Sequence, residues 1–161
     1  MKVLLIEDAA CMYRAFETLL QESGHEVHVC VGCQSLEPLV LTASDGSANA
    51  LASHSFDVAL CDGQLIGSIE GPAIVEQLTR LGIPSFGIST QDSFNQAMQK
   101  LGAKGGQNKA IALLLVMAGV LTPELIASDA EFNLGADVVD DCLKNKELRS
   151  KADALIMRFL S

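Results

Sequence analysis

The chain is short of basic residues and of long hydrophobic runs. Its 161 residues include 11 lysines and arginines against 20 aspartates and glutamates, which gives a net charge of -9. Because unspecific nucleic-acid binding requires a basic surface, this balance argues against direct nucleic-acid binding. The longest apolar run, residues 110–121, is shorter than the roughly 20 residues of a membrane-spanning helix. We therefore expect neither nucleic acid nor a membrane as a partner.

The N-terminus lacks a secretory signal, and the cysteines lack a disulfide pattern. Only four apolar residues, Val3 to Ile6, stand before two acids, so a cytoplasmic location is expected. Five cysteines, an odd number, then favour free thiols. Cys30 and Cys33 have C-x-x-C spacing, but no second ligand pair and no thioredoxin-like context accompany them. We expect these two thiols to be structural.

Strands and helices alternate along residues 1–121. The expected strands are 2–6, 26–30, 56–62, 83–89 and a weak one at 104–108. The expected helices are 12–22, a short one at 34–41, 71–81, 92–101 and 110–121, with 42–55 a loop or a weak helix near 48–53. This alternation predicts an α/β fold in which helices cover both faces of a parallel sheet. The element count favours a doubly wound, five-stranded, flavodoxin-like sheet of order 2-1-3-4-5.

Residues 122–161 have a different pattern and are expected to form a helical extension of the domain at 1–121. Thr122, Pro123 and Glu124 begin a short helix, and 137–143 and 146–160 predict two more. The last helix carries an apolar stripe, formed by Leu148, Ala152, Leu155, Ile156, Phe159 and Leu160. Such a stripe must be covered by the sheet domain, by a second protomer in a homodimer, or by another partner.

Asp62 follows the most buried strand of the pattern. Val58 to Cys61 is a short apolar run, and Gly63 ends it. Asp62 is therefore expected at the carboxyl end of a central strand, where sites form in open α/β sheets. The alternative is that Asp62 caps a turn, because aspartate is common in turns.

Polar residues follow three other strands and are expected at the same edge of the sheet. Glu7 and Asp8 follow the first strand, Ser89 the fourth, and Lys109 the fifth. Three clustered carboxylates repel one another unless a hard cation such as Mg²⁺ neutralises them. Asp62 could then attack a phosphoryl group whose oxygens the metal, Lys109 and Ser89 hold. A solvated turn, a surface lysine and a plain strand-end hydroxyl are the alternatives, and Lys104 is a rival for Lys109.

Four segments of this pattern resemble the response-regulator receiver domains of two-component signalling, over about residues 1–121. They are residues 3–8, 56–62, 84–89, and Gly102-Ala103 followed by Lys109. The resemblance implies that Glu7 and Asp8 bind Mg²⁺ directly or through water. It implies that Asp62 binds the metal and accepts the phosphoryl group, and that Gln64 offers its backbone carbonyl. Lys109 would pair with Asp62 or its phosphate, and Ser89 would move toward the phosphate.

The chain departs from the family pattern in ways that concern output more than acceptor chemistry. Ala110 stands where the family has proline, and Gly106 where it has an aromatic switch residue. The loop 63–71 lacks the common proline and is one residue longer, and the segment between the second and third strands is also longer.

The resemblance implies a phosphoacceptor that is not an enzyme beyond its own phosphorylation and dephosphorylation. A histidine kinase or phosphotransfer protein would be the donor, and a downstream protein would be the target. One alternative is a pseudo-receiver, an interaction or dimerisation module that works without phosphorylation. Another is a metal-dependent acid phosphatase, but such enzymes carry a second aspartate where this chain has Gln64.

Overall fold

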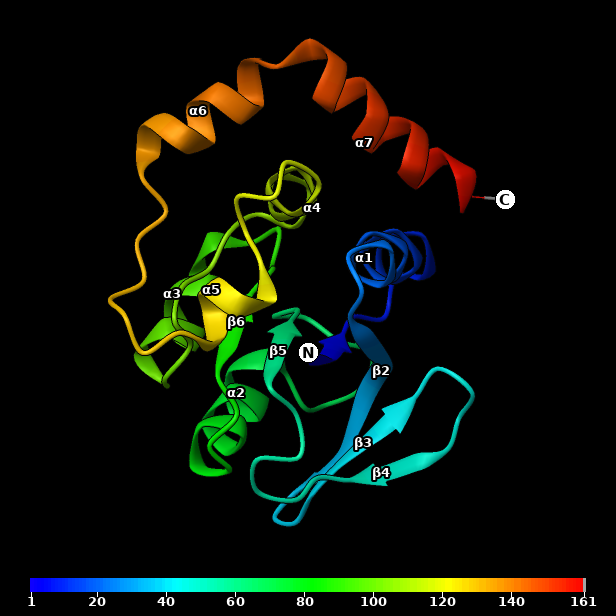
Figure 1. Cartoon of the computed structure of the whole chain (residues 1–161). Helices are drawn as coiled ribbons and strands as arrows, with labels where there is room; N and C mark the ends of the chain where they lie inside the picture. The colour runs from blue at the N-terminus through cyan, green and yellow to red at the C-terminus, as the bar shows by residue number, and fades with distance from the viewer. Residues whose placement is uncertain (161) are drawn as a thin grey trace.

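A six-stranded sheet of order β4-β3-β2-β1-β5-β6 forms the centre of the computed structural model, which describes residues 1–160 (Figure 1). The strands are β1 (Lys2–Ile6), β2 (Glu26–Leu36), β3 (Leu39–Ala43), β4 (Ala48–Ala50), β5 (Val58–Cys61) and β6 (Ser85–Gly87). The helices are α1 (Ala10–Glu22), α2 (Gly71–Arg80), α3 (Asp92–Lys100), α4 (Lys109–Met117), α5 (Pro123–Ala127), α6 (Ala136–Lys144) and α7 (Lys146–Arg158). Strands β2, β1, β5 and β6 are parallel, so the doubly wound α/β class is confirmed.

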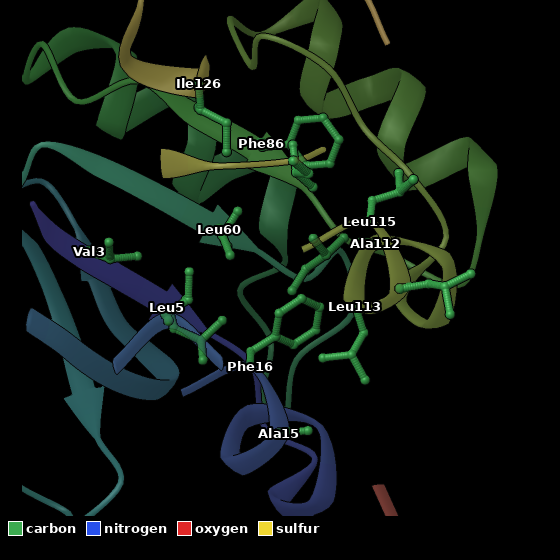
Figure 2. Packing of buried hydrophobic residues seen from close by; sticks show 14 of the residues in the cluster. Val3, Leu5, Ala15, Phe16, Leu60, Phe86, Ala112, Leu113, Leu115 and Ile126 are labelled. Carbon is green, nitrogen blue, oxygen red and sulfur yellow. The ribbon is translucent and has the colours of Figure 1, made fainter. Parts of the chain in front are cut away.

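Strands β1 and β5 are buried on both faces, as their unbroken apolar runs predict. Their side chains divide between two cores. Val3 and Leu5 point into a core with α1, α4 and the C-terminal helices, where Phe16 and Leu113 also lie (Figure 2). Leu4 and Ile6 point into a second core with α2, α3 and β3. Register pairs Ile6 with Cys61, so the residues that follow both strands emerge together.

The predicted helix at 34–41 is wrong, because a β-hairpin occupies this part of the chain. Strand β2 continues to Leu36, and β3 returns antiparallel beside it from Leu39. Leu39 and Leu41 are buried while Val40 between them is less so, an alternation typical of a strand. The weak helix expected near 48–53 is wrong as well, since β4 pairs with β3 there.

The predicted fifth strand is reduced to a single bridge between Gly87 and Gly106. Gly105 and Gly106 carry no side chains that could pack on the sheet, which weakens a strand. Phe132, from the segment after α5, covers this place instead. Its ring centroid lies 5.4 Å from that of Phe86 in β6.

The C-terminal helices pack on their own chain. Helices α6 and α7 lie against α4, and α7 also lies against α1 (Figure 1). Cys142 and Ala152 are buried in this contact, and Leu148, Leu155 and Ile156 pack against it. Met157 and Leu160 remain 66% and 58% exposed. The apolar stripe is thus largely covered by the sheet domain, the first of the three expected covers.

All five cysteines are free thiols, as their number predicts. Within residues 1–160, no helix combines the length and the hydropathy needed to span a membrane.

Candidate functional site

Three carboxylates meet at the carboxyl ends of β1 and β5. Glu7 and Asp8 follow β1, and Asp62 follows β5, where its N–H donates to the Ile6 carbonyl at 2.8 Å. One carboxylate oxygen from each of the three lies within 4.8 Å of the others. The side chains that the sequence predicts at this edge are therefore brought together.

Lys109 lies between two of these carboxylates. It begins α4, whose first turn is capped by the Asn108 side chain, which accepts from the Ala110 N–H at 3.0 Å. The Lys109 Nζ donates to Asp62 Oδ2 and to Glu7 Oε1, both at 3.0 Å. It also lies 2.8 Å from Glu7 Oε2, although without hydrogen-bond geometry. The rival Lys104 instead donates to the Ser128 carbonyl, away from the three carboxylates.

Burial and charge shift the ionisation of this cluster. Burial, together with the Asp62 charge, raises the pKa of Glu7 from 4.5 to about 7, against the opposing effects of Lys109 and the Ala9 N–H. Burial lowers the pKa of Lys109, but hydrogen bonds and charges from Glu7 and Asp62 outweigh it, so the net shift is upward. Lys109 therefore keeps its positive charge at neutral pH, whereas Glu7, with its raised pKa, exchanges a proton near that pH.

Asp62 lies beside Lys109 at the end of β5, and it also caps the turn that follows. Its Oδ2 pairs with Lys109, and its Oδ1 accepts from the Gly63 N–H at 2.7 Å, a contact that also stabilises the turn. A Cβ at Gly63 would overlap Phe94, so the loop after Asp62 is packed against α3. The Asp62 side chain is 5% exposed, and each of its oxygens accepts a hydrogen bond.

The loop after Asp62 forms one wall of an open crevice of about 330 Å³. The crevice is lined by Asp8, Asp62, Gln64, Leu65, Ile66, Thr90 and Lys109. Asp8 holds the loop, because its Oδ2 accepts from the Ile66 N–H at 2.9 Å. The Gln64 side chain accepts from Gln91 Nε2 at 3.1 Å and closes the loop toward α3.

Ser89 is at the expected edge but is not among the residues that line the crevice. It is buried, and its Oγ accepts from the Gln91 N–H at 3.1 Å. The next residue, Thr90, lines the crevice instead. Thr90 is not among the predicted site residues, although its place directly after a strand-end serine was a usable signal.

Asn95 is a second residue that the sequence analysis missed. It is 3% exposed, and its amide makes two hydrogen bonds to the backbone of Ser89, each 3.0 Å long. A Cβ on Gly106 would lie 2.7 Å from the Asn95 Cβ, so Asn95 fills the space beside the bare strand. Asn95 stands three residues before the buried Met98, a helical spacing that could have marked it as inward-facing.

The donor set fits a hard divalent cation. Mg²⁺ prefers oxygen ligands, and one or two carboxylates with water and carbonyl oxygens commonly hold it. Asp8 and Asp62 both face the crevice, and Glu7 is close enough to join them. The arrangement can bind a cation and present the Asp62 carboxylate to a group in the crevice.

In sequence, the chain matches no protein-family model and no curated protein. In structure, it is similar to a candidate response regulator from Chloroflexus aurantiacus, with TM-score 0.56 and 17% identity over 78% of this chain and 96% of that one. The chain has the receiver-domain fold. A CheY-like receiver domain protein from Methanospirillum hungatei matches 98% of this chain and 97% of its own, with TM-score 0.51 and 16% identity. The receiver domain of a modulated diguanylate cyclase from Desulfovibrio desulfuricans matches 95% and 96%, with TM-score 0.52 and 16% identity.

Proposed function

We propose that this receiver-like protein accepts a phosphoryl group on Asp62 in a Mg²⁺-dependent reaction and signals through protein–protein contacts. The observation that carries the proposal is the placement of Asp62. Its carboxylate lies at the end of a central strand, 3.0 Å from the Lys109 ammonium, in a crevice that it shares with Asp8. A buried turn-capping aspartate does not require a buried cation and two more acids around it.

The transfer follows from the chemistry of a carboxylate beside an ammonium. An Asp62 oxygen forms a bond to the phosphorus of a phosphohistidine on a histidine kinase or phosphotransfer protein. The P–N bond breaks, and the imidazole leaves with the electron pair and takes a proton from solvent. Lys109 then holds an oxygen of the new acyl phosphate, because its ammonium already contacts Asp62 Oδ2.

The metal would supply positive charge for the phosphoryl oxygens. Asp8, Asp62 and the Gln64 backbone carbonyl would hold Mg²⁺, and Glu7 would bind it directly or through water. Because Lys109 contacts the Glu7 carboxylate, its ammonium competes with the metal for the Glu7 oxygens. Thr90 and Ser89 are the hydroxyls at this edge, and Thr90 is the one that lines the crevice.

Phosphorylation is tested with a small phosphodonor, acetyl phosphate, and Mg²⁺. We expect intact-mass analysis to show one added phosphoryl group on the wild type, and none on Asp62→Asn or without Mg²⁺. Asp140→Asn, an exposed change in α6, is the matched control and should be labelled like the wild type. Labelling that persists in Asp62→Asn would rule out Asp62 as the acceptor.

A pseudo-receiver that works without phosphorylation is the second candidate. Two observations favour it: Asn95 fixes the backbone of Ser89, and Gly106 offers no side chain to report a change. A hydrolase is disfavoured, because the position two residues after Asp62 holds Gln64, whose side chain is bound to Gln91.

Output through the C-terminal helices is part of the proposal. Met157 in α7 and Leu160 just after this helix are exposed, which suits a homodimer or a downstream protein in the cytoplasm. Light scattering of the purified chain, with and without acetyl phosphate, distinguishes a homodimer from a monomer. A monomer under both conditions would leave a different protein as the target.

A further inference from the structure

A cavity of about 270 Å³ lies over the face of β1 and β2 that carries Lys2, Leu4, His28 and Cys30. Its floor is formed by the side chains of Leu4 and Cys30, and Val29, whose side chain belongs to the other core, also lines it. Burial, with a smaller effect of the Asp45 charge, raises the pKa of the Cys30 thiol to about 11. The floor is therefore uncharged at neutral pH.

The β-hairpin explains why the cavity is there. Apart from Leu51 and Phe56, the hairpin and the segment after it place small side chains over this face of the sheet. Ala43, Asn49, Ala50 and Ser55 line this side of the cavity. All three residues of β4 are exposed, so none of them reaches down to close the space.

Three side chains at the mouth form an ordered group. The Lys2 ammonium lies 4.8 Å from the centroid of the Phe56 ring, a cation–π distance. The His28 ring meets the same Phe56 ring edge-on, with centroids 5.3 Å apart and an interplanar angle of 78°. Phe56 therefore orders both polar groups beside the cavity before anything binds.

Lys2 supplies the lining of the cavity with an ammonium group. No carboxylate lines it, although the chain has a net charge of -9. Two acids beside it are engaged at its mouth: Glu26, which is opposite Lys2 in the β1–β2 register, contacts His28 Nε2 at 2.7 Å, and Asp57 accepts from the Lys2 backbone N–H at 2.7 Å. None of the ion pairs among residues 1–160 includes the Lys2 ammonium.

We propose that this cavity binds a small aromatic carboxylate, with the carboxylate on Lys2 and the ring between Phe56 and the apolar floor. One cation suits one carboxylate and is too little for a polyphosphate. The volume of about 270 Å³ is just below the range of ligand pockets, about 300 to 1,000 Å³, and so suits a single substituted ring. The site is independent of the phosphoacceptor chemistry proposed for Asp62.

Amide NMR spectra recorded during titration with benzoate and with benzamide test this proposal. We expect benzoate to shift the amides of Leu4, Val29, Cys30 and Ala50 saturably. Benzamide, its neutral isostere, should bind at least about tenfold more weakly, because it lacks the charge-assisted contact. Lys2→Gln should weaken benzoate to the same degree, whereas Lys100→Gln, an exposed change in α3, should leave it unchanged.

A second variant tests the location. Ala50→Leu adds a side chain at the wall of the cavity, and it should block benzoate while spectra elsewhere keep their wild-type pattern. Three results would overturn the proposal: no saturable shift of the cavity amides, equal binding of benzoate and benzamide, or unchanged benzoate binding in Lys2→Gln.

Discussion

Asn95 holds the backbone of Ser89 from both sides, accepting its N–H and donating to its carbonyl. The contact joins the first turns of α3 to the end of β6, directly beside the crevice with Asp62. It gives Ser89 a fixed position, so any movement of Ser89 toward a phosphoryl group must break two buried hydrogen bonds. The free-energy cost of breaking these bonds limits how readily Ser89 can move when a phosphoryl group occupies the crevice.

Removing the Asn95 amide should therefore destabilise the fold. Asn95→Ala leaves two buried backbone groups of Ser89 without partners, and we expect it to lower the free energy of unfolding by about 2–4 kcal/mol in urea denaturation. Asn95→Asp keeps the acceptor but places a buried carboxylate oxygen against the Ser89 carbonyl, so at neutral pH it should be at least as destabilising as Asn95→Ala. Gln96→Ala, at the next and exposed position, should change stability by less than about 0.5 kcal/mol. Equal losses of stability in Asn95→Ala and Gln96→Ala would show that the hydrogen bonds from Asn95 to Ser89 do not stabilise the fold.

An acyl-phosphate mimic should stabilise the wild type through Asp62. With Mg²⁺ and beryllofluoride at about 100 times the dissociation constant, a ligand that binds only the folded state adds about 2.7 kcal/mol. We expect thermal unfolding to show a higher midpoint for the wild type and no change for Asp62→Asn. Asp140→Asn should behave as the wild type. No rise in the wild type would favour the pseudo-receiver.

The raised pKa of Glu7 predicts a pH dependence of stability in metal-free buffer. Between pH 4.5 and about 7, the folded chain keeps a proton on Glu7 that the unfolded chain has released. Stability from this proton is present below pH 4.5 and is lost as the pH rises to 7, by up to about 3 kcal/mol. Glu7→Gln, which cannot ionise, should flatten this slope in urea unfolding at a series of pH values.

Glu131→Gln is the control for that series, because Glu131 is exposed and lies outside the carboxylate cluster. It should keep the wild-type slope. If Glu7→Gln keeps that slope as well, Glu7 is ionised in the folded chain throughout this range. Stabilisation of its charge by Lys109 then outweighs the free-energy cost of burying it.

A charge on the inner side of α7 should release the C-terminal helices. Ala152 is buried against the core with α1 and α4, whereas Ala154 on the same helix is exposed. Because burying an unpaired carboxylate is costly, Ala152→Glu should undock α7 and speed limited proteolysis between residues 128 and 135 by about tenfold or more. Ala154→Glu should be cleaved at the wild-type rate. Acetyl-phosphate labelling of Ala152→Glu would then show whether residues 1–121 work without a docked extension.

Buried strands and the residues at their ends could be predicted from the sequence. The runs at Val3–Ile6 and Val58–Cys61 are continuous and short, so the strands and the convergence of Glu7, Asp62 and Lys109 followed from the order of the elements. The hairpin could not, because the local pattern is mixed: Leu36 and Leu39 have a helical spacing, whereas Leu39 and Leu41 have an alternating one. Which of these periods prevails depends on pairing with β2, a contact between strands that local pattern does not contain.

Side-chain direction past the end of a strand was the other limit. Ser89 and Thr90 are both hydroxyl residues, and only the packing of Asn95 and Gln91 decides which of them lines the crevice. Similarly, the apolar stripe of α7 predicts that a surface covers it, but not that α1 and α4 of the same chain supply that surface.

Because Gly105 and Gly106 have no side chains to cover the edge of the sheet, Phe132 covers it, and this limits where the chain can be truncated. A fragment that stops at residue 121 loses Phe132 and leaves the Phe86 ring uncovered at the edge of the sheet. It also loses the Ser128 carbonyl to which Lys104 donates. A fragment that stops at residue 134 keeps both contacts and loses only α6 and α7. We expect the longer fragment to stay dispersed at concentrations where the shorter one aggregates, so the end of the last β-α unit is a poor place to cut this chain.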